Sequence, residues 1–169
     1  MEFRNFMLLF VFWATYIHPE IIEINIKVDG MVCTACVSTI KKALLSKVSE
    51  LSDITNIDLG TGIVQAKLKN GNNLTIAQLQ TRLKNAVEKA SYKFQDIANI
   101  VATGNVKKDK QGYFLVVSVS NQKINIPSRL FEQAALLLNM PALLSGNIQK
   151  VKNLFSIADD EKASLTQSI

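Results

Sequence analysis

The sequence predicts an α+β fold in which one antiparallel sheet carries two amphipathic helices. Residues 22–28 alternate apolar and polar side chains, which is the period of a strand with one buried face. Residues 37–48 and 76–90 instead repeat apolar side chains every three or four positions, as a helix with one buried face does. Turns that contain glycine separate the other alternating segments. Elements of this kind pack as a two-layer sandwich.

Six elements are predicted between residues 21 and 100, in the order strand, helix, strand, strand, helix, strand. They are a strand at 22–28, a helix at 37–48, strands at 54–59 and 63–68, a helix at 76–90 and a strand at 92–100. Gly60-Thr61-Gly62 joins the two middle strands as a hairpin, and Thr75 with Gln78 predicts a capping box at the second helix. This βαββαβ order is that of a ferredoxin-like sandwich, and we expect one such domain at residues 21–100.

A second, small β-rich unit with one helix is expected at residues 101–157. Its strongest strand signal is Tyr113–Val119, and its helix is expected between Pro127 and Pro141. Residues 103–106, TGNV, are echoed by residues 145–148, SGNI, which suggests two similar strand entries in an OB-like barrel. A barrel this short is expected to be incomplete. Residues 158–169 have few apolar side chains, and we expect a flexible tail there.

The first twenty residues are typical of a targeting segment. Arg4 precedes an apolar stretch from Phe6 to Ile17 that is interrupted by Thr15. A bilayer span needs about twenty apolar residues, so this shorter stretch predicts a signal peptide or a short N-terminal anchor at residues 1–20. A buried N-terminal strand or helix is the alternative. We expect a periplasmic or secreted protein, which stays membrane-anchored if the segment is not cleaved.

The charge of the chain leaves several partner classes open. A net charge of +5 and a pI near 9.2 suit an acidic protein, an anionic membrane surface or nucleic acid. A basic stripe with interleaved aromatic side chains is missing, so we expect no nucleic acid partner. No Ser-His-Asp, paired-carboxylate or phosphate-loop constellation can be assembled from the sequence, and we do not expect an enzyme.

Cys33 and Cys36 are the predicted metal ligands. Cys33 follows the first strand, and Cys36 is expected in the first turn of the next helix. A helix N-terminus carries unpaired N–H groups and partial positive charge, which favour thiolate over thiol. Two soft sulfurs without a hard ligand nearby select Cu(I), with Hg(II) or another soft metal ion as the alternative. Met31 is expected to be an apolar plug beneath the loop, and the alternative role is a third sulfur ligand.

Residues 30–44, GMVCTACVSTIKKAL, closely resemble the heavy-metal-associated (HMA) domain family. The resemblance extends over about residues 21–100, because residues 58–62 look like the family's hairpin and residues 88–92 look like the end of its second helix. It implies a free-standing copper chaperone or scavenger, or a periplasmic mercury-binding protein. Val37 after the second cysteine is similar to the copper branch.

The resemblance also implies a mode of action and a set of partners. One ion is carried by Cys33 and Cys36 and passed on by ligand exchange through a three-coordinate intermediate. The implied partner is a metal-transporting membrane ATPase or another metal acceptor or donor protein, and two copies can form a transient metal-bridged homodimer. The position of Tyr92 relative to the motif implies that its side chain shields the metal loop. The alternative is a core aromatic residue at the start of the last strand. The lysines of the first helix dock an acidic partner or form a solvated face; they are Lys41, Lys42 and Lys47.

Two other functions are open to the CxxC pair. A thiol-disulfide oxidoreductase also places CxxC between a strand and a helix. The thioredoxin-like fold supports its site with a cis-proline loop. Pro19, Pro127 and Pro141 all lie outside residues 21–100, which argues against that fold here. An interaction module whose docking is regulated by metal is the third possibility. A structural zinc site needs four ligands. The chain has two cysteines and one distant histidine, His18, so it cannot complete such a site alone.

Overall fold

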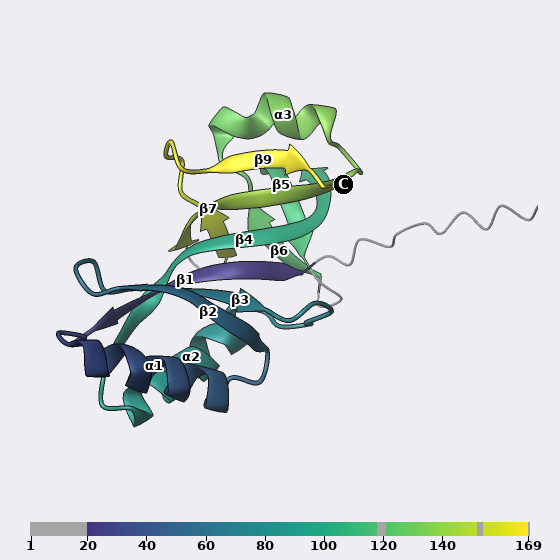
Figure 1. The fold of residues 1–169 in the computed structure, drawn as a ribbon. Helices are drawn as coiled ribbons and strands as arrows, with labels where there is room; N and C mark the ends of the chain where they lie inside the picture. Colours follow the sequence, from purple (N-terminus) through teal and green to yellow (C-terminus); the bar gives the residue numbers. More distant parts are fainter. Residues whose placement is uncertain (1–19, 118–120, 152–153, 169) are drawn as a thin grey trace, which may run out of the picture.

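The computed structural model describes residues 20–117, 121–151 and 154–168 (Figure 1). Its elements are, in chain order, β1 (Ile21–Asp29), α1 (Thr34–Lys47), β2 (Leu51–Asp58), β3 (Ile63–Leu68), α2 (Ile76–Lys89), β4 (Lys93–Asp109), β5 (Gly112–Val117), β6 (Gln122–Asn125), the 3-10 turn η1 (Ser128–Leu130), α3 (Phe131–Leu136), β7 (Pro141–Val151), β8 (Leu154–Ile157) and β9 (Ser164–Gln167). Residues 1–19 of the signal peptide or anchor expected at residues 1–20 lie outside the described residues. Among the residues described, no helix is both long enough and apolar enough to cross a bilayer.

The N-terminal half has the predicted βαββαβ arrangement. Its strands lie in the order β2-β3-β1-β4, and each neighbouring pair is antiparallel. Helices α1 and α2 lie together on one side of this sheet, and the C-terminal strands lie on the other (Figure 1). Alternation along β1 and helical spacing along α1 and α2 bring one set of apolar side chains into the core between the layers. This set includes Ile24, Ile26, Val28, Ile40, Leu44, Leu79 and Leu83.

The local sequence signals of this half are confirmed. At the start of α2, the Thr75 hydroxyl accepts a hydrogen bond from the Gln78 amide, and the Gln78 side chain accepts one from the Thr75 amide. β2 and β3 pair as the predicted hairpin, although β2 begins three residues earlier than expected, at Leu51. The capping box therefore marks the start of α2, and the hairpin turn separates β2 from β3, as their residue types predict.

β4 belongs to both halves of the molecule. It is 17 residues long. Residues 93–102 pair with β1, residues 99–105 pair with β7 on the opposite edge, and residues 105–109 pair with β5. We expected the first domain to end at residue 100, and β4 runs through that position without a break. The two halves are thus joined by a continuous strand.

The C-terminal half is a small closed barrel. β4, β5, β6, β8 and β7 pair in a ring, in which β6 and β8 are parallel and the other neighbours are antiparallel. Five strands are also the number in an OB-like barrel. An incomplete barrel is expected from residues 101–157 alone, and the ring closes because β4 begins in the N-terminal half and supplies one of its strands. Its buried side chains include Val106, Leu115, Val117, Ile124, Leu144 and Ile157.

The echoed TGNV and SGNI segments mark close crossings in the barrel. They lie in β4 and β7, which pair with each other. A Cβ on Gly104 would stand 2.3 Å from the carbonyl oxygen of Val116, and a Cβ on Gly146 would stand 2.3 Å from the Ile157 side chain. Neither position has room for a side chain, so both glycines are required for the strands to approach.

The chain ends in a paired strand, and the flexible tail expected from residue 158 is wrong for residues 164–167. β9 pairs with β7 from Ser145↔Ser164 to Ala142↔Gln167. Leu165 in this strand and Ala163 just before it are buried. The segment has few apolar residues because only alternate positions of an edge strand face the core.

Gly104→Ala is expected to lower the free energy of unfolding by about 2 kcal/mol, because the added Cβ meets a backbone oxygen that cannot move aside. Urea unfolding followed by circular dichroism measures this change. Gly60→Ala is the control, since its Cβ would lie 3.4 Å from the nearest atom, Oδ1 of Asp58. The control should change stability by less than about 0.5 kcal/mol. Equal stability of G104A and the unmodified chain would contradict the close crossing.

Candidate metal centre

The predicted metal ligands lie on the short loop between β1 and α1. Gly30 turns the chain at the end of β1 with a φ of +91°, which glycine adopts without steric cost. A Cβ on Gly30 would stand 3.7 Å from the Tyr92 ring, so Tyr92 is a neighbour of the loop. Tyr92 also packs against the hydrophobic core. Tyr92 is therefore a core aromatic next to Gly30, and its shielding of the metal loop stays a prediction.

Met31 and Val32 differ sharply in exposure. Met31 is 4% exposed and is part of the core cluster, which is the position expected of an apolar plug. Val32 is 88% exposed and stands immediately before Cys33. Val32 is not among the predicted site residues, and the one sequence signal for it is an apolar side chain in a loop, outside the period of any strand or helix. Val32 gives the metal loop an exposed apolar rim.

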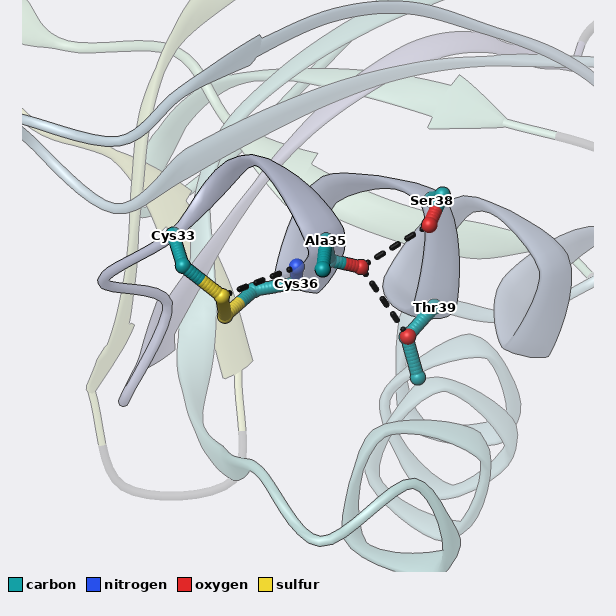
Figure 2. Close-up of a disulfide and its surroundings, with 5 residues drawn as sticks. All are labelled: Cys33, Ala35, Cys36, Ser38 and Thr39. Carbon is teal, nitrogen blue, oxygen red and sulfur yellow. Dashed lines mark hydrogen bonds between the residues drawn. A yellow bond between two sulfur atoms is a disulfide. The ribbon is translucent and has the colours of Figure 1, made fainter.

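Cys33 and Cys36 occupy the N-terminus of α1, as predicted. Cys33 is the N-cap residue with extended backbone, and its Sγ accepts a hydrogen bond of 3.3 Å from the Cys36 amide (Figure 2). A sulfur in the N-cap position is thus satisfied by an N–H group that the helix leaves unpaired. Within the first turn, the Ala35 carbonyl accepts hydrogen bonds from the hydroxyls of Ser38 and Thr39, which lie one turn further along α1.

The two sulfurs form a disulfide, with their Cα atoms 5.2 Å apart (Figure 2). This is the oxidised form, in which neither sulfur is a thiolate. Reduction by two electrons and two protons gives two thiols at the same place. Their surroundings differ, because Cys33 is exposed whereas Cys36 is 8% exposed and belongs to the core cluster. The pair therefore has one accessible sulfur and one sheltered sulfur.

The β2–β3 turn supports the end of β1, close to the metal loop. The Thr61 hydroxyl donates a 2.7 Å hydrogen bond to Asp58, and the Thr61 and Gly60 amides donate to the same carboxylate. These hydrogen bonds, with that of the Thr61 hydroxyl largest, lower the pKa of Asp58. The Val28 amide then donates to the Gly62 carbonyl at 2.9 Å. The ordered turn thus holds the strand that carries the loop.

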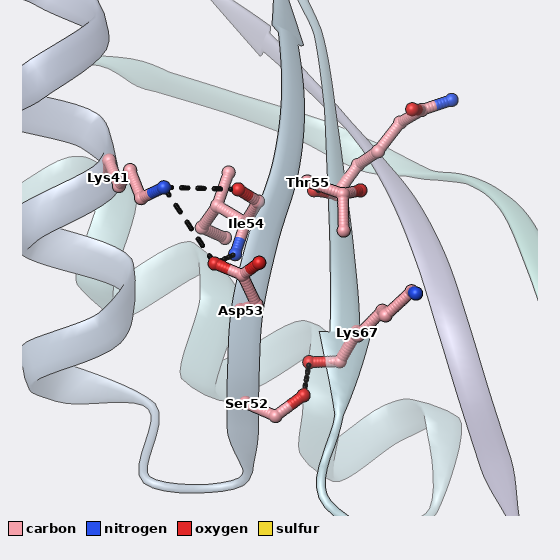
Figure 3. Close-up of polar contacts among 7 residues, drawn as sticks. Lys41, Ser52, Asp53, Ile54, Thr55 and Lys67 are labelled. Carbon is pink, nitrogen blue, oxygen red and sulfur yellow. Dashed lines mark hydrogen bonds and ion pairs between the residues drawn. The ribbon is translucent and has the colours of Figure 1, made fainter.

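Lys41 has partners within the fold. Its ammonium group donates to the Ile54 carbonyl at 3.2 Å and lies 3.7 Å from the Asp53 carboxylate (Figure 3). β2 is the end strand of the sheet, and Lys41 gives a backbone carbonyl of this strand a hydrogen-bond partner from α1. Of the three lysines expected to dock a partner, Lys41 is engaged in this contact. Lys42 and Lys47 are exposed on α1.

The described ranges contain no other cluster suited to a metal ion. No group of three or more histidine, cysteine, aspartate or glutamate side chains that could hold a metal is found in them. His18 lies outside these ranges. Within them, the donors available to a soft ion at this loop are the two cysteine sulfurs and, beneath them, the buried Met31.

Comparison with known proteins finds no matching family model and no matching curated protein. Two solved structures are similar to part of the chain. One, described as "Crosstalk between Cu(I) and Zn(II) homeostasis", has 24% identity and a TM-score of 0.36, over 44% of this chain and 97% of its own. The other, oxidized MerP from Ralstonia metallidurans CH34, has 26% identity and a TM-score of 0.35, over 44% of this chain and 93% of its own. Both TM-scores are below 0.5, so the fold is assigned from the strand order and helix positions of this chain.

Alkylation of the reduced protein is expected to distinguish the two thiols. Iodoacetamide should modify Cys33 roughly ten times faster than Cys36, because Cys33 is exposed and Cys36 lies against the core. Mass spectrometry of peptides after short reaction times measures both rates. In guanidinium chloride the two rates should become similar. Faster alkylation of Cys36 in the folded protein would contradict the asymmetry.

Proposed function

We propose that this protein is a soft-metal carrier that binds one Cu(I) ion through the thiolates of Cys33 and Cys36. The observation that carries the proposal is the placement of both sulfurs at the N-terminus of α1, on one short loop. The helix terminus offers N–H groups and partial positive charge to a pair of thiolates. Among the described residues, no histidine, aspartate or glutamate joins the two sulfurs in a group that could hold a metal ion, and a pair of sulfurs suits a soft ion.

Copper is the preferred ion and mercury is the alternative. Cu(I) and Hg(II) are both soft and accept two thiolates. The preference for copper comes from the sequence, because Val37 follows the second cysteine as in the copper branch of the heavy-metal-associated family. Competition between Cu(I) and Hg(II) for the reduced protein measures the preference, and we expect Cu(I) to be retained.

Release by ligand exchange agrees with the different exposure of the two sulfurs. A thiolate of the acceptor forms a bond to the ion from the side of the exposed Cys33, which gives a three-coordinate intermediate. The bond from the ion to Cys33 then breaks, a second acceptor thiolate replaces Cys36, and both cysteines are left free. Val32 provides an apolar contact at the entry side.

The partner proposed is a metal-transporting membrane ATPase or another metal donor or acceptor protein. Lys42 and Lys47 are exposed on α1 and favour an acidic docking surface. A second copy of this chain, sharing the ion in a transient metal-bridged dimer, is the other partner considered. We place the carrier in the periplasm or outside the cell, or at a membrane if residues 1–20 stay attached.

One observation favours a second function, that of a thiol-disulfide oxidoreductase. Cys33 and Cys36 are joined as a disulfide, and Cys33 is accessible to an incoming thiolate. Oxidoreductases of the thioredoxin type support such a pair with a cis-proline loop, whereas the prolines described here, Pro127 and Pro141, are trans and lie in the barrel half. A metal-regulated interaction module is the third candidate. Turnover with a substrate disulfide separates the enzyme from the carrier.

Anaerobic titration of the reduced full chain with Cu(I), against a competing chelator, tests the carrier directly. One ion per chain should be bound tightly. Cys33→Ser/Cys36→Ser should weaken binding by more than about a hundredfold, since loss of outer partners of a metal ligand alone costs 10–100-fold. Met31→Leu is the matched control and should change affinity by less than about twofold, because Met31 packs in the core.

Each outcome of the titration has a definite meaning. Failure to compete with the chelator would overturn the carrier, and turnover of a model disulfide at the same cysteines would then support the oxidoreductase. A tenfold or greater loss in M31L would show that the thioether is a third ligand.

A further inference from the structure

We propose that the outer face of the C-terminal barrel binds a linear polysaccharide that carries carboxylate groups. This face is formed by β4, β5 and β6, and we call it the barrel face. Its side chains are Asn105, Lys107, Phe114, Val116, Lys123 and Asn125. The inference goes beyond metal carriage and does not depend on it.

Strand pairing determines which side chains form the barrel face. Val106, Leu115 and Ile124 lie in one row across the three strands, and all three are fully buried inside the barrel. Successive side chains of a strand point to opposite sides of the sheet, so the two neighbouring rows face outward. One row is Lys107, Phe114 and Asn125, and the other is Asn105, Val116 and Lys123.

The barrel face is open to a ligand. Asn105, Lys107 and Lys123 are exposed, and Val116 and Asn125 are half-buried. These side chains are spread over three paired strands, so the surface that they form is broad and does not enclose a ligand. Such a surface suits a long ligand that makes several separate contacts.

The charge of this surface favours a polyanion. Lys107 and Lys123 belong to the barrel face, and Lys108 and Lys110 follow Lys107 on the β4–β5 hairpin. The carboxylate among them is Asp109, which lies 3.5 Å from the Lys123 ammonium. Four lysines with one aspartate leave a local excess of positive charge, and such an excess attracts a chain of anionic groups.

Two of the ammonium groups are held in place on the barrel face. That of Lys123 lies 4.2 Å from the centre of the Phe114 ring, as in a cation–π contact, and beside Asp109. That of Lys107 donates to the Asn139 side chain at 2.8 Å. The Cα atoms of Lys107 and Lys123 are about 12 Å apart, because two residues of strand rise and two strand spacings separate them. Fixed charges at separate points suit a ligand with repeated acidic groups.

The polar side chains between the lysines suit sugar hydroxyls. Each outward row contains one lysine and one asparagine, in opposite order across the sheet. A side-chain amide both donates and accepts hydrogen bonds, as a hydroxyl group does. Asn105 and Asn125 therefore match hydroxyl groups, while Lys107 and Lys123 match carboxylates. The half-buried Val116 offers an apolar contact to the C–H groups of a sugar ring.

A nucleic acid or an acidic peptide fits the barrel face less well. Single-stranded nucleic acid stacks its bases on open aromatic rings. The Phe114 ring is 7% exposed beneath Lys123, and the Tyr113 ring packs against Phe131 with centroids 5.2 Å apart. An acidic peptide brings carboxylates without sugar hydroxyls, which leaves the two asparagines of the face without matching groups.

Binding at the barrel face leaves the metal loop accessible. Lys93 at the start of β4 pairs with Asp29, the last residue of β1 before that loop. Lys93 and Asn105 are about 40 Å apart along β4, at the usual rise of a strand. Figure 1 shows α1 and the strands β5 and β6 in separate parts of the molecule. A carrier held by a polysaccharide in this way still presents Cys33 to other proteins.

Isothermal titration calorimetry of the full chain with an oligogalacturonate at low ionic strength tests the proposal. Lys107→Gln/Lys123→Gln should weaken binding by about tenfold, because two ammonium groups lose their carboxylate partners. Lys89→Gln/Lys93→Gln is the matched control, since it removes the same charge from exposed positions in the other half. The control should change affinity by less than about twofold. Thermal unfolding by circular dichroism checks that both variants are folded.

Comparison ligands identify the chemistry that the barrel face recognises. Asn105→Ala/Asn125→Ala should weaken oligogalacturonate binding by about threefold, because hydrogen bonds to hydroxyl groups are lost. The same variant should bind polyglutamate as the unmodified chain does. Polyglutamate and oligothymidylate should both bind the unmodified chain about tenfold more weakly than oligogalacturonate. Cys33→Ser/Cys36→Ser should bind oligogalacturonate normally, which separates this result from that of the metal titration.

The proposal is overturned if oligogalacturonate does not bind, or if K89Q/K93Q weakens binding as much as K107Q/K123Q. Equal or tighter binding of polyglutamate would also overturn it and would assign the barrel face to an acidic protein. The same result with oligothymidylate would assign the face to nucleic acid.

Discussion

The pairing of β4 with three other strands is the constraint on which the rest of the structure depends. β4 is the edge of the sheet under α1 and α2, and it is also a wall of the C-terminal barrel. A shift of one residue in its register with β1 would turn the buried faces of both halves outward. Gly104 allows β5 to cross at the point where β4 passes from one half to the other. The barrel and the helix-covered sheet therefore keep a defined mutual orientation.

The position of the candidate metal centre depends on these strand pairings. β1 is held between β3 and β4, and the turn at Asp58 and Gly62 fastens its end. The loop that follows places Met31 in the core and Cys33 in solvent. The proposed carriage of a soft ion needs two sulfurs in one place for binding and one reachable sulfur for release. The different exposure of Cys33 and Cys36 agrees with both parts of that proposal.

The sequence predicts those features of the structure that depend on residues close together in the chain. The capping box at Thr75 and the position of Cys36 depend on a few adjacent residues, and both are confirmed. The continuity of β4, the closed barrel and β9 depend on pairing between residues far apart in the chain, which no local period encodes. The contact of Lys41 with β2 was missed for the same reason, because its partner Asp53 belongs to another element. The exposure of Val32 was not predicted, because a single apolar residue in a loop belongs to no repeating pattern of strand or helix.

The central claim is that two sulfurs, from Cys33 and Cys36, form the whole first shell of a soft ion. Copper K-edge X-ray absorption on the reduced full chain, loaded with one equivalent of Cu(I), tests it most directly. We predict a first shell of two sulfur atoms and no nitrogen or oxygen, and the same spectrum for Met31→Leu. A shell that contains nitrogen or oxygen, or a third sulfur that disappears in M31L, would contradict the two-sulfur site.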